Sequence, residues 1–217
     1  NVCGLGQVRH REFVQASGEL SDEEFASFLT RTHERLAEAI KPGGVVFSCM
    51  DWRSIATLIR AGQSAKLDLI NLAVWDKGVG GMGSLYRSQH ELVSVFRSPG
   101  ASHRNNVELG KHGRNRTNVW TYAGMNTGGR ERDELLALHP TVKPVELVSD
   151  AIKDVTAQGE CVLDCFGGSG TTMVAAEKTR RKAVLVELDP IYVDTIILRM
   201  KQTAGLDAIH AVTGERF

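Results

Sequence analysis

Apolar side chains recur at helical spacing soon after Ser21, and this pattern predicts the first helix of the chain. Ser21 and Glu24 stand three residues apart, like the first and last residues of a capping box. Apolar residues then return every three or four positions until Ile40. The Pro-Gly-Gly sequence at 42–44 cannot continue a helix, so we expect the helix to end just before it.

Short apolar runs further along the chain predict buried strands. They cover residues 45–50, 69–75 and 92–96, and a helical pattern occupies residues 53–61 between the first two. Between residues 98 and 132 apolar periodicity is almost absent, and we expect no regular element there. A stretch of that length without regular structure inside a compact domain is usually functional.

The last third of the chain alternates between helical and strand patterns. We expect a helix from Pro144, a strand over 161–165, a helix over 171–179, a strand over 183–188 and a helix over 190–203. This alternation is typical of a parallel sheet with helices packed on it. The sequence therefore predicts an α/β fold.

The composition is that of an ordinary globular protein. The 217 residues suffice for one domain with a full core, and 42% hydrophobic with 24% charged residues excludes long disorder. No apolar run approaches the roughly 20 residues of a membrane span. The four cysteines show no CxxC pair and no Cys/His ligand spacing. We therefore expect no membrane segment, no metal site and a reducing, cytoplasmic location.

Positive charge is concentrated in the middle of a chain whose formal net charge is zero. Residues 77–132 carry nine Lys or Arg against three Glu, an excess of six. Such a basic region can bind a polyanion, including nucleic acid. A solvated, arginine-rich loop would produce the same pattern, and charge alone does not separate the two interpretations.

A glycine-rich turn follows one of the predicted strands. The strand ends in Asp164, Gly168 and Gly170 follow, and the next helix begins at once. Glycines let the backbone approach a ligand closely, and the N–H groups at a helix start would face it. Glu187 ends the next predicted strand, 23 residues after Asp164, where a carboxylate can accept both hydroxyls of a ribose.

The turn does not match the common nucleotide-binding loops. It is neither the GxGxxG dinucleotide fingerprint nor the GxxxxGK[ST] phosphate loop. This disfavours a nicotinamide-dependent oxidoreductase. Phe166 suits an adenine or a methionine ligand better than a pyrophosphate. A tight strand-to-helix turn needs glycines in any case, so the turn on its own leaves a purely structural role open.

Several motifs occur in an order that identifies a family. Residues 164–172 read Asp-x-Phe-x-Gly-x-Gly-Thr-Thr, and residues 139–144 read His-Pro-Thr-Val-Lys-Pro. Further segments that match the same family pattern are Pro-Gly-Gly at 42–44, Trp-Asp-Lys at 75–77 and Arg-Ser-Gln-His-Glu at 87–91. Together they resemble the β class of amino-group DNA methyltransferases, which methylate adenine N6 or cytosine N4, over essentially the whole chain.

The resemblance implies a fold and a domain plan. The fold is the Rossmann-like fold of S-adenosylmethionine-dependent methyltransferases, with a mostly parallel sheet flanked by helices and the circularly permuted order of the β class. Residues 1–217 would form a single methyltransferase domain that lacks its N-terminal catalytic-motif segment. Within it, residues 98–132 would be a target-recognition insertion and residues 139–217 the cofactor-binding half.

The resemblance also implies the cofactor S-adenosylmethionine and the residues that hold it. Phe166 would lie near its adenine or methionine part, Glu187 would bind the ribose, and Asp164 would order the loop or meet the methionine amino group. Lys143 could offset the methionine carboxylate, although a lysine at a helix start is often only a surface residue. The full predicted set is Thr141, Lys143, Pro144, Asp164, Phe166, Gly168, Gly170, Thr171 and Glu187.

By the same resemblance the partner is double-stranded DNA, and the basic middle of the chain would read it. Arginine and asparagine pair with guanine and adenine edges, and arginine also binds phosphates. A homodimer and a cognate restriction enzyme are both compatible with the family. The predicted DNA-binding residues are Arg87, Arg104, Asn105, Lys111, Arg114 and Arg116.

The family motif (Asp/Asn/Ser)-Pro-Pro-(Tyr/Phe), which binds the target amine and stacks on the flipped base, does not occur in the 217 residues. We expect it upstream of Asn1, and we expect the 217 residues alone to be inactive. The function that we expect is methyl transfer to the exocyclic amine of a flipped base, with adenine N6 as the favoured target. The alternatives are a cytosine-N4 methyltransferase and an inactive DNA-binding homologue.

Overall fold

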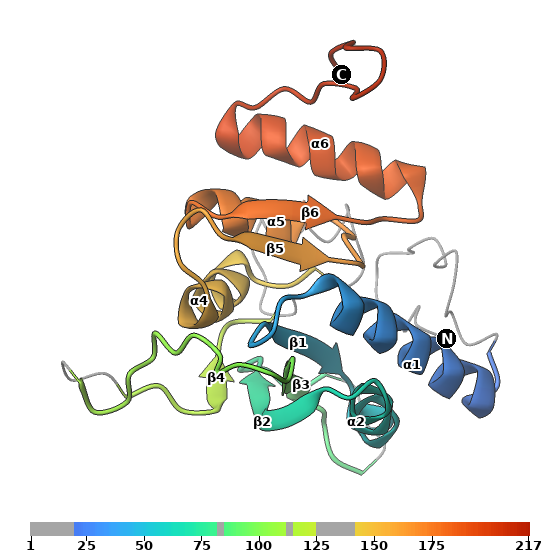
Figure 1. Ribbon diagram of the computed structural model, residues 1–217, viewed down its shortest axis with the longest axis vertical. Coiled ribbons are helices and arrows are strands. Elements are labelled where there is room, and N and C mark those ends of the chain that lie inside the picture. The colour runs from blue at the N-terminus through green and yellow to red at the C-terminus, as the bar shows by residue number, and fades with distance from the viewer. Residues whose placement is uncertain (1–19, 82–84, 112–114, 125–141) are drawn as a thin grey trace. The chain divides into compact units, whose positions relative to one another are not determined.

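A computed structural model describes residues 20–81, 85–111, 115–124 and 142–217. The chain divides into two compact units, mainly Gln15–Asn126 and Thr127–Phe217. Their elements are labelled in Figure 1. Among the described residues, no helix is long and apolar enough to cross a membrane.

The described residues of the first unit form a four-stranded sheet and two helices. The capping box is confirmed: the Glu24 N–H donates to the Ser21 hydroxyl at 3.3 Å, and the Glu24 carboxylate accepts from the Ser21 N–H at 2.8 Å. The sheet has the strand order β1-β3-β2-β4. The elements are α1 (Asp22–Ala39), β1 (Val45–Met50), α2 (Ile55–Ser64), β2 (Asp68–Asp76), β3 (His90–Arg97) and β4 (Val119–Thr121).

The predicted mostly parallel sheet is wrong for this unit, because β3 lies antiparallel between β1 and β2. Only β2 and β4 pair in parallel. The described part of the connection from β2 to β3, residues 77–81 and 85–89, contains no helix. Parallel neighbours need a long crossover, usually a helix, whereas a simple loop returns the chain antiparallel. The sheet is therefore mixed.

The core of the first unit lies where α1 and α2 meet β1 and β3. Phe96 is fully buried, and its ring meets the His33 ring edge-on at a centroid distance of 5.6 Å. His33 Nε2 lies 3.1 Å from the Ser48 hydroxyl, so this buried histidine is hydrogen-bonded. The buried apolar cluster consists of Leu29, Val46, Leu58, Ala61, Leu67 and Phe96.

The strand β4 was missed by the sequence prediction, which expected no regular element between residues 98 and 132. It pairs Trp120 with Trp75 of β2, and both indoles are almost fully buried. Three residues are too few for a period-two pattern to be recognised. The strand is defined by its pairing with β2, which no local pattern in the sequence indicates. Part of this segment therefore belongs to the sheet.

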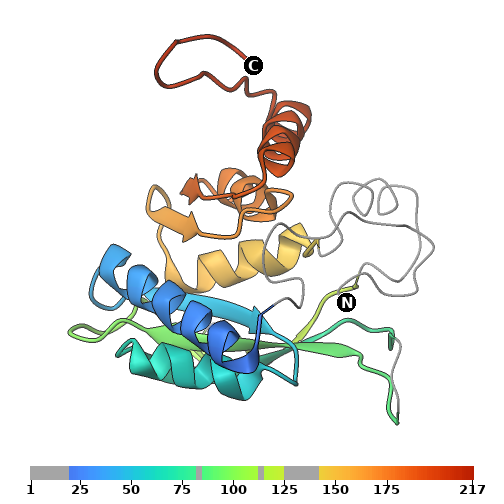
Figure 2. The same ribbon diagram turned by 90° about the vertical axis from the view of Figure 1, so that its right-hand side faces the viewer.

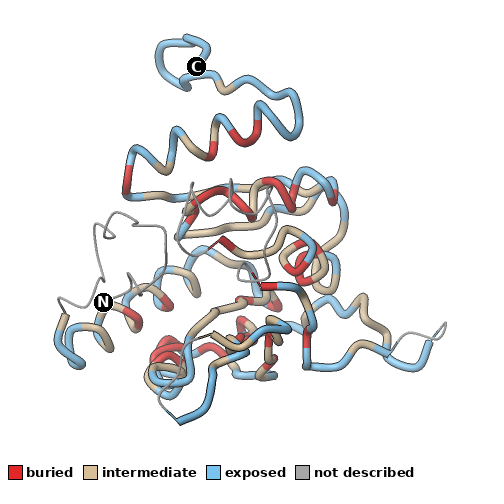
Figure 3. Tube along the Cα trace, turned by 180° about the vertical axis from the view of Figure 1, so that it is seen from behind, coloured by how far each residue is buried: buried red, intermediate tan, exposed pale blue. Residues whose placement is uncertain are grey.

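Within residues 142–217, the second unit has a parallel pair of strands and three helices. β5 pairs with β6 in register from Cys161 opposite Lys182 to Asp164 opposite Leu185. Asp189 caps the last helix by accepting from the Ile191 N–H at 3.0 Å. Along that helix buried and exposed positions alternate (Figure 3). The elements are α4 (Val145–Val155), β5 (Cys161–Asp164), α5 (Thr171–Lys178), β6 (Lys182–Leu185) and α6 (Pro190–Ala204).

Candidate cofactor-binding site

Asp164 organises the turn that connects β5 to α5. One carboxylate oxygen accepts from the Phe166 N–H at 2.9 Å, and the other accepts from the Thr172 hydroxyl at 2.5 Å. Both oxygens are thus engaged by the turn itself. Of the two roles expected for Asp164, the ordering of the loop is the one supported by these contacts.

The glycines of the turn occupy conformations that other residues disfavour. Gly168 has φ 51° and Gly170 has φ 78°, both in the left-handed region. Gly170 is also the N-cap of α5, and a Cβ there would lie 3.1 Å from side-chain atoms of Ile196 in α6. The turn therefore needs glycine at position 170 both for its backbone angle and for the close approach of α6.

Glu187 joins this turn to the segment that follows β6. Its Oε2 accepts from the Gly168 N–H at 2.7 Å, and its Oε1 accepts from the N–H groups of Leu188 and Asp189 at 2.8 and 2.9 Å. Because β6 ends at Leu185, the predicted strand to 188 is too long. Glu187 lies in the loop beyond it, half-buried and hydrogen-bonded to the glycine turn. The strands β5 and β6, which precede the turn and this loop, lie side by side (Figure 2).

The segment before α4 reaches the same turn. Thr171, the first residue of α5, is buried and donates its hydroxyl to the Lys143 carbonyl at 3.4 Å. Pro144 follows as the N-cap of α4. The Phe166 ring is 61% exposed, so a ligand can pack against it. The structure thus brings eight of the nine predicted cofactor residues to one loop cluster, and Thr141 lies outside the described residues.

Arg199 is a member of this cluster that the sequence prediction missed. It is only 7% exposed, and its Nη1 donates to the Ser169 carbonyl at 2.9 Å and to the Thr171 hydroxyl at 3.2 Å. Burial lowers the pKa of the Arg199 guanidinium, which still remains charged at neutral pH. A signal was available, because Arg199 falls on the buried stripe of α6 with Ile196 and Met200.

Replacing Arg199 with methionine should loosen the glycine turn. The Ser169 carbonyl and the Thr171 hydroxyl would lose a buried donor, which we expect to lower the free energy of unfolding by about 1–3 kcal/mol. Urea denaturation measures this effect. Lys178→Met, at an exposed position of α5, is the matched control and should change it by less than about 0.5 kcal/mol. An Arg199→Met variant as stable as the control would show that the contacts are not stabilising.

Cys165 lies within the turn, and we expect its thiol to react slowly. Burial, and then the negative charge of Asp164, raise the pKa of the Cys165 thiol. Since the thiolate is the reactive form, modification of Cys165 by a disulfide reagent at pH 8 should lag behind that of the exposed Cys161. Peptide mapping after timed labelling measures both rates. Faster labelling of Cys165 would contradict the expected environment.

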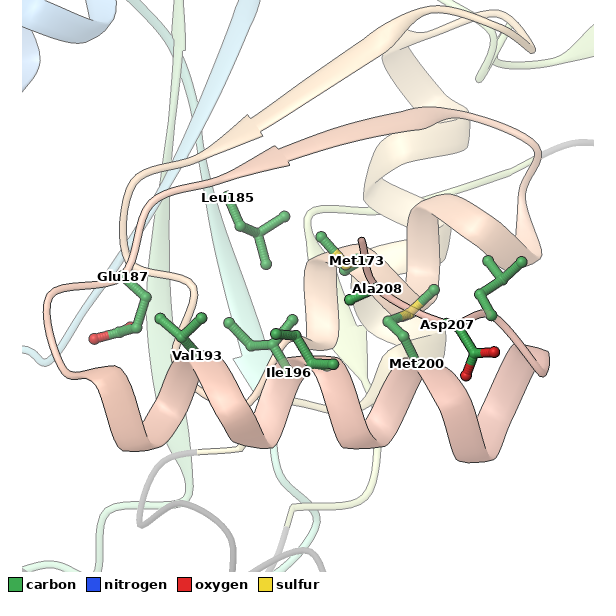
Figure 4. Close-up of a pocket in the computed structure, with 10 residues that line it drawn as sticks. Met173, Leu185, Glu187, Val193, Ile196, Met200, Asp207 and Ala208 are labelled. Carbon is green, nitrogen blue, oxygen red and sulfur yellow. The ribbon is translucent and has the colours of Figure 1, made fainter. Parts of the chain in front are cut away.

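A pocket of about 310 Å³ lies in the second unit between β6, α5, α6 and the C-terminal segment (Figure 4). Its lining is almost wholly apolar and includes Met173, Leu185 and Ile196. Glu187 is the one predicted cofactor residue on its rim, and its carboxylate points away from the cavity. The pocket offers few partners to a ribose or an amino acid, so the glycine turn is the better candidate site.

The predicted DNA-binding residues lie mainly on the surface of the first unit. Arg87, Arg104, Asn105 and Lys111 are exposed, and Lys111 forms an ion pair of 3.7 Å with Glu108. The Asn105 side-chain oxygen accepts from backbone N–H groups of its own turn. Arg114 lies outside the described residues.

Arg116 differs from the other predicted DNA contacts because its side chain is packed against the sheet. Its guanidinium lies over the Trp120 ring at 5.0 Å and donates to the Tyr122 hydroxyl at 3.2 Å. Part of its role is therefore to cover the indole.

Comparison with solved structures shows a common fold. The M1.HpyAVI–SAM complex aligns with a TM-score of 0.68 at 22% identity, covering 86% of each chain. The cytosine-N4-specific PvuII DNA methyltransferase aligns with a TM-score of 0.68 at 18% identity, covering 87% of this chain and 74% of that one. The chain thus has a Rossmann-like methyltransferase fold.

Comparison of sequences adds the family. The type II methyltransferase M.BglI of Bacillus subtilis is 28% identical over 177 residues, which cover 73% of this chain. The chain spans 39–61% of the length of three curated relatives that it matches. The model of the N6/N4 methyltransferase family, described as DNA methylase, matches residues 8–198. The chain therefore belongs to the N6/N4 family of DNA methylases.

Proposed function

We propose that this chain binds S-adenosylmethionine and DNA as part of a methyltransferase that modifies the exocyclic amine of a flipped base. The favoured target is adenine N6. The observation that carries the proposal is the glycine turn, tied by Glu187 on one side and by Asp164 on the other. Family membership supports the reaction, and the basic residues of the first unit support the nucleic-acid substrate.

The residues of the loop cluster fit this cofactor. A carboxylate has about four lone-pair sites, and three of those on Glu187 accept backbone N–H groups. One site remains for a ribose hydroxyl, and a second hydroxyl would have to replace the Gly168 N–H. The exposed Phe166 ring can pack on the adenine or on the methionine part of the cofactor. Lys143 and Pro144 come close to the turn through the bond to Thr171.

When bound, S-adenosylmethionine supplies the electrophilic methyl group. The residues of this chain then have to hold the methionine and ribose ends of the cofactor. Arg199 holds the glycine turn in place by donating to the Ser169 carbonyl. The target amine additionally needs an oxygen acceptor and a stacking ring from the (Asp/Asn/Ser)-Pro-Pro-(Tyr/Phe) motif. The 217 residues contain no Pro-Pro sequence, so we propose that they do not complete the reaction alone.

We further propose the division of the chain implied by the motif order. Residues 98–132 would contribute to DNA reading and residues 139–217 would be the cofactor half, within one domain of circularly permuted order. Cytosine N4 is the second candidate target, and the likeness to the PvuII enzyme, which is cytosine-N4-specific, favours keeping it.

Equilibrium binding distinguishes this proposal from the nicotinamide alternative. Isothermal calorimetry of the chain should show one site for S-adenosylmethionine or its demethylated product and no heat with NAD. Circular dichroism confirms that the protein is folded. A folded chain that binds NAD and not S-adenosylmethionine would overturn the proposal.

A further inference from the structure

Trp52 is an exposed tryptophan directly after a strand of the first sheet. Its side chain is 55% exposed, whereas Trp75 and Trp120 are only 3% and 8% exposed. An exposed indole offers a flat apolar face and an N–H donor to a partner, and tryptophan is enriched at interfaces for this reason. Its position two residues beyond the end of β1 is therefore worth a functional explanation.

The turn that carries Trp52 is held in one arrangement by Asp51. Asp51 Oδ1 accepts from the N–H groups of Arg53 and Ser54 at 2.9 and 3.1 Å, which fixes the backbone. Its Oδ2 accepts from the Arg53 guanidinium at 3.3 Å. That guanidinium lies over the Trp52 ring, 5.0 Å from the ring centroid. An indole and a guanidinium plane are thus presented together at the surface.

The pair lies at the edge of the sheet where a ligand is expected. β1 and β2 run in the same direction because both are antiparallel to β3, and β4 is parallel to β2. The carboxyl ends of these three strands therefore share one edge. In open α/β sheets, ligands bind outside the carboxyl ends of the strands. Lys77 follows β2 at the same edge, 4.7 Å above the Trp75 ring.

We propose that Trp52 and Arg53 form a stacking platform for an unstacked base of the DNA substrate. This inference rests on the proposed function, since a methyltransferase of this family must take its target base out of the helix. Aromatic rings and guanidinium planes bind bases by stacking, largely irrespective of sequence. Asp51 would be a positioning residue, because it acts through Arg53 and the turn.

The test compares two single-stranded oligonucleotides of equal length, one of mixed sequence and one with abasic sugars throughout. Trp52→Ala should weaken binding to the first by about 5- to 100-fold and to the second by less than about twofold, because only the first has bases to stack. Trp52→Phe should retain most of the affinity. Ile70→Ala removes an apolar side chain near the opposite end of β2 and should bind like the wild type.

The outcomes separate this inference from the proposed function. Equal weakening for both oligonucleotides, or no weakening for either, would overturn the platform. If Trp52 instead contacts a protein, we expect no weakening for either oligonucleotide. Methyl transfer to genomic DNA is measured in parallel with the wild-type protein as its gene encodes it. If the wild-type protein transfers no methyl groups, the result counts against the proposed function. If it does, and the Trp52→Ala variant transfers them equally well, the result counts against the platform alone.

Discussion

Glu187→Ala is expected to weaken binding of S-adenosylmethionine by about 10- to 150-fold, or about 1.5–3 kcal/mol, the usual scale for losing hydrogen bonds to a charged group. The reason is twofold. The variant removes the carboxylate that we expect to bind the ribose, and it frees the Gly168 N–H that Glu187 now holds at 2.7 Å. Isothermal calorimetry measures the change directly.

Two variants interpret that result. Glu187→Gln keeps one acceptor oxygen and should lose less affinity than Glu187→Ala. Glu177→Ala removes an exposed acid from α5, outside the glycine turn, and should bind normally. Urea denaturation of each variant separates loss of the turn from loss of the ligand contact. Unchanged affinity in a folded Glu187→Ala protein would remove Glu187 from the site.

Neutralising the basic middle of the chain is expected to change the salt dependence of DNA binding. Each phosphate contact contributes about 0.9 to the slope of log affinity against log salt. If Arg104, Lys111, Arg114 and Arg116 all meet phosphates, replacing the four with glutamine should flatten the slope by about 3–4 units. Fluorescence titrations at several salt concentrations give the slope. A slope that stays the same would place the DNA surface elsewhere.

The structure predicts different effects for the individual replacements. The Lys111 ammonium is exposed, and Lys111→Gln alone should lower the slope by about 1. Arg116 covers Trp120, so Arg116→Gln should also lower stability, unlike Lys111→Gln. A smaller fall together with relaxed sequence preference would indicate that some of these residues contact bases. Lys178→Gln, in the second unit, should leave the slope unchanged.

Local signals predicted the elements that depend on neighbouring residues. The capping box of Ser21 and Glu24 is confirmed, because it is made by residues three apart. The helical pattern after Trp52 gave a helix over 53–61, whereas α2 spans Ile55–Ser64, because Asp51 holds residues 53 and 54 in a turn. Boundaries of this kind depend on side-chain hydrogen bonds.

Contacts between distant residues could not be read in the same way. An apolar run such as residues 92–96 predicts burial but not direction, and β3 proved to be antiparallel to both neighbours. Arg199 lies 30 residues from its partner Ser169, and only folding brings them together. The glycine turn was recognisable because its functional residues are close together in sequence, whereas the hydrogen bond from the Gly168 N–H to Glu187 joins residues 19 positions apart and was not.

The identity of the methylated nucleoside decides whether methyl groups are transferred to the exocyclic amine of adenine. The 217-residue chain, and the protein as its gene encodes it, are each incubated with DNA and methyl-labelled S-adenosylmethionine, and the digested nucleosides are identified by mass spectrometry. We expect label on adenine N6 with the gene-encoded protein and none with the 217 residues alone, because these contain no Pro-Pro sequence to bind the target amine. Robust transfer by the 217 residues alone, or none by the gene-encoded protein, would contradict the proposed reaction.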